Sequence, residues 1–216
     1  MLKKQFLTFV FITAITVFTN AQLKYAIIGG INFSNVYSSG LDSNKSVPGP
    51  TFSFATMIPV GKLLVKPEIQ YSQRGYVIKS ENIGGNVNFT NKFKQVIHYV
   101  ELPIELIYPI ETGNGQFFIG AGPVIGAAIS GKQKTVLNLL GNRDENTTDL
   151  KFGNESNQLK AIDFGGRINV MFVFILGFIL KADYNFGFAN LSNNNKDFYN
   201  RSFGIAIGYL WGSAKK

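Results

Sequence analysis

Residues 99–108 read YVELPIELIY and carry a clear alternation of apolar and polar residues. Every second residue from Val100 to Tyr108 is apolar, whereas Glu101 and Glu105 lie on the opposite side of the same segment. A period of two is the signature of a β-strand whose two faces meet different surroundings. The stretch therefore predicts a strand with one apolar face and one face that carries charges.

The same period recurs along the rest of the chain. Seven further segments alternate in this way: residues 24–35, 51–58, 65–72, 117–126, 162–170, 180–188 and 203–211. Most of them reach the about 9–11 residues that a tilted strand needs to cross a membrane. The pattern predicts an all-β fold, a single antiparallel up-and-down barrel of eight strands.

The composition narrows the possible chemistry. Of the 216 residues 45% are hydrophobic and only 16% are charged, against about 25% in an average soluble domain. Such a chain is too apolar for intrinsic disorder. The absence of cysteine excludes disulfides, thiolate zinc sites and cysteine nucleophiles. Because His98 is the single histidine, few catalytic triads could be assembled from this sequence.

The N-terminus has the features of an export signal. Lys3 and Lys4 precede an apolar run at residues 6–18, and the small residue Ala21 follows it. The run is shorter than the about 20 residues of a membrane-spanning helix. We therefore predict a signal peptide at residues 1–21, cleaved after Ala21, with an N-terminal membrane anchor as the alternative.

The connections between the expected strands alternate in length. Residues 59–62 and 111–115 are short turns, and a third short turn near residues 172–176 has no turn residue that would fix it. Long polar loops are expected at residues 36–48, 73–96, 131–160 and 191–200. Short periplasmic turns and long outer loops are typical of outer-membrane barrels. No repeat or linker divides residues 22–216, which we predict to be one barrel domain.

The polar face carries charges of both signs. They are Lys66, Glu68, Glu101, Glu105, Asp163, Arg167, Lys181 and Asp183. An eight-stranded barrel is barely wide enough for its own side chains, so we expect these groups to form ion pairs inside it. In particular, the three glutamates should pair with Lys66, Arg167 and Lys181. Alternation alone does not exclude a soluble barrel, which is apolar inside and polar outside.

Aromatic residues gather near the strand ends. They are Tyr25, Phe33, Tyr71, Tyr108, Phe117, Phe188, Tyr209 and Trp211. Membrane barrels carry aromatic girdles at both interfaces. Together with the export signal, this distribution favours a barrel in the outer membrane, and a secreted or periplasmic lipocalin-like barrel is the main alternative.

Several sequence blocks are shared with a known family. The most distinctive are KPEIQYSQRG at residues 66–75 and YVELPI at residues 99–104. Glycine-rich blocks accompany them: GGINFSN (29–35), FIGAGP (118–123), DFG (163–165), YNFG (184–187) and GIAIGY (204–209). In these blocks the chain resembles the PorT-like outer-membrane β-barrel family of Gram-negative bacteria, whose barrels are OmpA-like. The resemblance implies a single eight-stranded barrel in the outer membrane. It implies little about activity, although the namesake's part in secretion makes an envelope or secretion protein an expected kind of partner.

No group of residues predicts catalysis, a cofactor or a metal. His98 and Glu101 are three positions apart and so lie on opposite faces of a strand. Glu101 and Glu105 share a face but are roughly 13 Å apart at about 3.3 Å per residue, beyond the about 5–9.5 Å of carboxylates that act on one bond. Residues 142–149, NRDENTTD, lack the ligand spacing of a calcium loop and are expected to be a solvated loop.

The net charge of +8 raises the question of an anionic partner. Cations are scattered over the expected outer loops: Lys79, Lys92, Lys94, Lys132, Lys134, Arg143, Lys151 and Lys160. They form no compact basic stripe with interleaved aromatics, so we expect no nucleic-acid partner. On a membrane barrel they would face outward, where they either meet lipopolysaccharide phosphates or form a solvated surface.

Two classes of function remain, with an enzyme a distant third. The first is a non-catalytic outer-membrane barrel that anchors, scaffolds or adheres, in contact with lipid and an envelope partner. The second is a small passive pore. The predicted lumen carries five acids and three bases, which can cross-link it, whereas open aqueous channels typically have about 16 strands or more. We therefore favour the first class.

Overall fold

The structure, a computed structural model, describes residues 23–38, 44–82, 89–139, 142–194 and 197–212. The predicted signal peptide at residues 1–21 lies outside these ranges, as does the predicted mature start at Gln22. Within the described ranges, no helix is long and apolar enough to cross a membrane.

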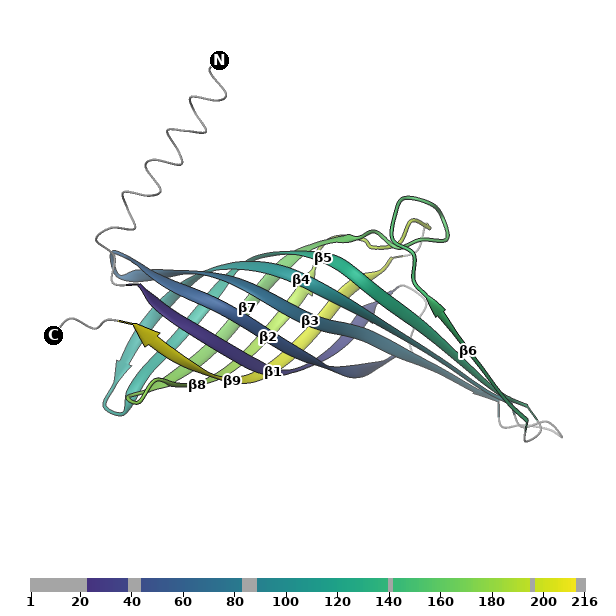
Figure 1. Cartoon of the computed structure of the whole chain (residues 1–216), viewed down its shortest axis with the longest axis horizontal. Helices are drawn as coiled ribbons and strands as arrows, with labels where there is room; N and C mark the ends of the chain where they lie inside the picture. The colour runs from purple at the N-terminus through teal and green to yellow at the C-terminus, as the bar shows by residue number, and fades with distance from the viewer. Residues whose placement is uncertain (1–22, 39–43, 83–88, 140–141, 195–196, 213–216) are drawn as a thin grey trace, which may run out of the picture.

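The described residues form nine antiparallel strands, eight of which close into a ring (Figure 1). The strands are β1 (Lys24–Tyr37), β2 (Asn44–Val60), β3 (Leu63–Asn82), β4 (Phe89–Thr112), β5 (Gly115–Leu139), β6 (Asn142–Asp149), β7 (Ile162–Phe174), β8 (Phe178–Gly187) and β9 (Tyr199–Gly212). Sequence neighbours pair around the ring except that β5 pairs with β7, and β9 returns to β1. The ring confirms the predicted eight-stranded barrel, in which the closed sheet removes exposed strand edges.

The apolar face of each strand points outward. In β9, Ile205 and Ile207 are exposed and Ile207 is 70% accessible, whereas Ala206 between them is 8% accessible. The same alternation holds in β4, where Leu102, Ile104 and Leu106 are exposed and the residues between them are buried. An apolar surface that runs around the whole barrel is the surface that a lipid bilayer covers.

Three short turns lie at one end of the barrel. The β2–β3 turn is at Gly61 and Lys62 and the β4–β5 turn is at Gly113 and Asn114, both where the sequence predicted them. The third, between β7 and β8, uses Gly177, whose φ of 89° suits a residue without a side chain. Gly177 lies one position beyond residues 172–176, so that stretch contains no turn residue that could mark the end of the strand.

At the other end, two of the predicted long loops are largely strand. The expected loops at 73–96 and 131–160 contain the ends of β3 and β5, the start of β4 and the whole of β6. These parts form a four-stranded extension that we call the blade, and Figure 1 shows it projecting beyond the barrel. The blade consists of residues 76–82, 89–96, 131–139 and 142–149. The prediction failed because the apolar alternation fades along these strands, whereas backbone pairing continues. The expected loop at 36–48 is also shorter, since β1 reaches Tyr37 and β2 begins at Asn44.

The remaining connections at this end fold together. We call residues 150–161, 188–194 and 197–198 the cap. A backbone hydrogen bond from Lys160 N to Leu191 O, 2.9 Å, joins its two parts. The Asn193 side chain donates to the carbonyl oxygens of Gly153 and Gln158. Leu191 is fully buried and belongs to a cluster with Val36, Tyr76 and Phe198. The cap is thus attached to the mouth of the barrel.

Candidate functional site

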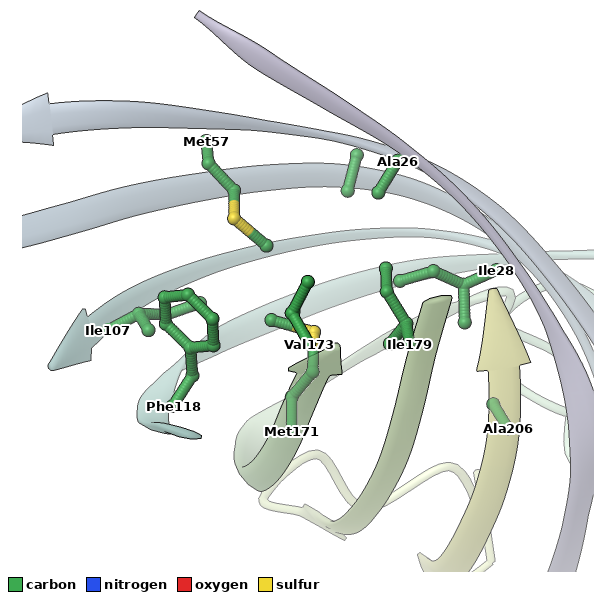
Figure 2. Packing of buried hydrophobic residues seen from close by; sticks show 10 residues of the cluster. Ala26, Ile28, Met57, Ile107, Phe118, Met171, Val173, Ile179 and Ala206 are labelled. Carbon is green, nitrogen blue, oxygen red and sulfur yellow. The ribbon is translucent and has the colours of Figure 1, made fainter. Parts of the chain in front are cut away.

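The inside of the barrel is filled with side chains, in three layers from the short turns to the cap. The lowest layer, the floor, is apolar (Figure 2). It consists of Ala26, Ile28, Ala55, Met57, Ile107, Phe118, Met171, Val173, Ile179 and Ala206. The prediction of a polar lumen is therefore wrong at this end. Both faces of the strands are apolar here, since Ile107 points inward between the outward residues Leu106 and Tyr108.

The middle layer is a network of buried charges. Lys66 Nζ lies 2.7 Å from Glu68 Oε2 and also contacts Glu105 Oε2, and all three side chains are fully inaccessible. Lys181 Nζ lies 3.6 Å from Glu68 Oε1 and 3.3 Å from Asp183 Oδ1. Glu68 thus holds two lysines from two different strands, β3 and β8.

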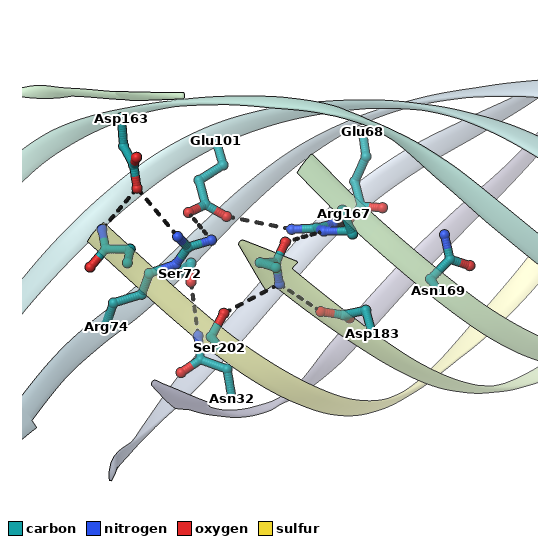
Figure 3. Close-up of polar contacts among 12 residues, drawn as sticks. Asn32, Glu68, Ser72, Arg74, Glu101, Asp163, Arg167, Asn169, Asp183 and Ser202 are labelled. Carbon is teal, nitrogen blue, oxygen red and sulfur yellow. Dashed lines mark hydrogen bonds and ion pairs between the residues drawn. The ribbon is translucent and has the colours of Figure 1, made fainter. Parts of the chain in front are cut away.

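Arg167 on β7 reaches across the same layer (Figure 3). Its Nη1 lies 3.4 Å from Glu68 Oε1 and its Nη2 lies 3.5 Å from Glu101 Oε2. Its Nε donates to Asn185 Oδ1 at 2.6 Å. One guanidinium therefore links strands β3, β4, β7 and β8 across the lumen. Buried charges need such partners because an unpaired charge in a dry interior is costly.

A ninth charged residue, Arg74, completes the layer and was missed from the sequence. Its Nη2 lies 2.7 Å from Glu101 Oε1 and its Nη1 lies 3.4 Å from Asp163 Oδ2. The predicted strand ended at Ser72, yet the period of two continues directly to Arg74, which is the signal that would have found it. Each of the eight predicted charges lies in the lumen and makes at least one ion pair. Among the side chains that the structure describes, the layer holds five acids and four bases.

Side-chain amides supply further donors to the carboxylates. Asn169 donates to Glu105 Oε1 at 2.6 Å, and Asn200 donates to Asp163 Oδ2 at 2.8 Å. A void lined by Arg74, Glu101 and Asp163, among others, has a volume of only about 10 Å³. A cavity of that size holds about one water molecule. Neighbouring charges in this layer are thus joined by direct ion pairs and by hydrogen bonds from side-chain amides.

The uppermost layer lies at the mouth. Tyr76 packs edge-on against Phe198 of the cap, with ring centroids 5.5 Å apart. Below them Tyr99 is fully buried and its hydroxyl accepts a hydrogen bond from Asn200 Nδ2 at 3.2 Å. The barrel is therefore closed at its mouth as well as at its floor.

Comparison with known sequences agrees with a closed ring of strands whose outer surface faces lipid. The sequence profile described as "outer membrane protein beta-barrel domain" matches residues 19–193. The chain belongs to this family. Membership implies a location in the outer membrane of a Gram-negative bacterium.

Among solved structures, other outer-membrane barrels are similar. Neisserial surface protein A is 12% identical, covering 86% of this chain and 96% of its own, with a TM-score of 0.42. Ail of Yersinia pestis, in complex with the heparin analogue sucrose octasulfate, is 13% identical over 88% of this chain and 99% of its own, with a TM-score of 0.42. OprG of Pseudomonas aeruginosa is 13% identical over 89% and 98%, with a TM-score of 0.47. At these identities the similarities carry no information on function. No curated protein matches the sequence.

The predicted aromatic girdle residues of this outer-membrane barrel domain lie on its outer face. At the short-turn end Tyr25 and Trp211 have ring centroids 6.3 Å apart, and Tyr209 stacks on Trp211. Tyr108 and Phe117 are on the outer face at this same end. Phe33, Tyr71 and Phe188 lie toward the loop end, where Phe188 contacts Phe186 edge-on at 5.2 Å.

The barrel separates the residues that would make an acid–base pair. His98 lies on the outer face, where its Nδ1 is 2.6 Å from the Tyr71 hydroxyl. Glu101 lies in the lumen between Arg74 and Arg167. Within the described parts of the chain, no three histidine or acidic side chains are close enough to hold a metal ion. Residues 142–149, predicted as a solvated loop, are the exposed strand β6.

Proposed function

We propose that this outer-membrane barrel is a non-catalytic anchor and scaffold that holds the blade and the cap outside the cell, and that it does not conduct solutes. The observation that supports this function is the closure of the lumen at three levels. In the middle layer Lys66, Glu105 and Arg167 are at most 1% accessible, a degree of burial that a water-filled channel would not allow.

Electrostatics supports the same proposal. A pore that selects ions exposes charge to water, whereas here every charged group of the middle layer faces a group of opposite sign. Eight strands leave an interior just wide enough for side chains, whereas the water-filled porins have 16–18 strands. The charges are thus better suited to linking the strands than to guiding ions.

The blade and the cap are the parts of this barrel that an extracellular or envelope partner would meet. Strand β6 is exposed along its whole length, and β5 carries it well past the ring. We propose adhesion to, or assembly with, an envelope protein as the role of this surface. The PorT-like sequence blocks make a component of secretion machinery a reasonable partner, and export would use the signal peptide proposed at residues 1–21.

Planar-bilayer recordings test the proposal. We expect the purified wild-type protein to give no steady single-channel conductance in concentrated KCl. Phe118→Gly, which empties part of the floor, should also remain silent because the ion-paired layer above it is intact. Steady wild-type openings would overturn the scaffold and support the passive pore.

A further inference from the structure

The outer face of the blade contains a basic cleft. It has a volume of about 440 Å³, and five of its lining residues are cations: Lys79, Lys92, Lys94, Lys134 and Arg143. The sequence predicted that these residues are scattered over long outer loops, and it left open whether they meet lipopolysaccharide phosphates or form a solvated surface. The loop assignment is wrong, because the pairing of β3, β4, β5 and β6 brings these residues together from positions far apart in the chain.

The strand register sets like charges against each other in this cleft. Lys79 lies directly opposite Lys92, and Lys94 lies directly opposite Lys134. Like charges in directly opposed positions destabilise a β-sheet. An anion bound between these lysines would offset their mutual repulsion. The arrangement of the cleft therefore favours binding of an anion.

Only part of the positive charge is neutralised within the cleft. Glu145 on β6 lies 2.7 Å from Lys134 Nζ and also contacts Arg143. Hydrogen bonds from Lys134 and Arg143 lower the pKa of Glu145, so this carboxylate stays ionised at neutral pH. Lys79, Lys92 and Lys94 form no ion pair with any side chain that the structure describes. Their ammonium groups each offer three hydrogen-bond donors to a ligand.

The cleft continues the lipid-facing surface. Lys92 and Lys94 have the same strand parity as the outward residues Leu102 and Ile104, so they lie on the outer face of β4. Lys79 is 16 residues beyond Leu63, the first residue of β3 at the short-turn end. At about 3.3 Å per residue and a tilt of about 40°, it lies roughly 40 Å above that turn. A bilayer with its headgroups is about 40–45 Å thick, so this height matches the outer polar layer.

We propose that the cleft binds the phosphate groups of the phosphorylated glycolipid in the outer leaflet, lipopolysaccharide. The inference rests on the proposed function in one respect, that the blade lies on the outer side of the membrane. Lys79, Lys92 and Lys94 would contact the phosphate oxygens, while Lys134 and Arg143 remain shared with Glu145. Lipid bound in this way would hold the blade against the membrane surface.

Binding of lipopolysaccharide to the detergent-purified protein tests the proposal. The cleft variant is Lys92→Gln/Lys94→Gln, and Lys62→Gln/Lys151→Gln, from the short-turn end and the cap, removes the same charge elsewhere. We expect about 30-fold weaker binding for the cleft variant, since each lysine at an anionic lipid surface contributes about a factor of five. The control variant should bind as the wild type does, and phosphatase-treated lipopolysaccharide should bind neither wild type nor control appreciably.

Urea unfolding without lipopolysaccharide distinguishes lost binding from lost folding. The cleft variant should be at least as stable as the wild type, because it removes two like-charge pairs. Equal binding by both variants would overturn the proposal. So would equal binding of phosphatase-treated lipopolysaccharide, or tighter binding of soluble polyphosphate than of the lipid. These outcomes are independent of the bilayer recordings, so a silent barrel that does not bind phosphate would disprove the inference and leave the scaffold intact.

Discussion

Replacing Arg167 with alanine is expected to lower the free energy of unfolding by about 3–5 kcal/mol. The guanidinium contacts Glu68 and Glu101 and donates to Asn185, and it is 1% accessible. Its loss would leave two carboxylates with fewer counter-ions in a nearly dry interior. Urea unfolding in lipid vesicles measures the change.

The matched control removes a charge from an ion pair at the surface. Glu145→Gln breaks the contacts with Lys134 and Arg143 on the blade, where solvent screens them. This variant should unfold at the same urea concentration as the wild type. If Arg167→Ala is as stable as Glu145→Gln, the middle layer does not hold the barrel together.

The second large effect is expected from Ile207→Arg, which should cost about 2–4 kcal/mol in a bilayer. Ile207 is 70% accessible on the outer face of β9, and five positions separate it from Gly212 at the short-turn end. About 11 residues of a tilted strand cross the membrane, so this side chain lies near the midplane. A charged group there must be taken out of water into hydrocarbon. Unfolding in vesicles measures the cost.

Ile175→Arg makes the same substitution where lipid does not cover the protein. Ile175 lies in the β7–β8 turn and is 78% accessible. Its variant should fold as stably as the wild type. Equal stability of Ile207→Arg and Ile175→Arg would mean that the outer face of the barrel does not contact lipid.

The sequence predicted the barrel wall well because each wall strand separates two different environments. In residues 99–108 lipid meets Leu102, Ile104 and Leu106, while Glu101 and Glu105 meet other charges. Because the two faces meet different surroundings, apolar and polar residues alternate along the strand with a period of two. The eight charged lumen residues could be selected from that period alone, although their individual partners could not.

The prediction failed where the two faces do not differ. At the floor Ile107 is an apolar inward residue between the apolar outward residues Leu106 and Tyr108, so nothing marked it as a lumen residue. On the blade both faces carry polar residues, and β6 contains no apolar residue at all. Its strands were therefore taken for loops, and the basic cleft that depends on their register could not be seen.

The accessibility of the lumen to water distinguishes a closed scaffold from a water-filled barrel. The chain contains no cysteine, so a single introduced thiol reports on its own position. Ser72 is 1% accessible in the lumen, where its hydroxyl accepts a hydrogen bond from Asn32, and Ser156 is exposed on the cap. In the folded protein we predict that a charged thiol reagent labels Ser156→Cys rapidly and leaves Ser72→Cys unlabelled until urea is added. Rapid labelling of Ser72→Cys in the folded barrel would show a water-filled lumen and contradict the closed scaffold.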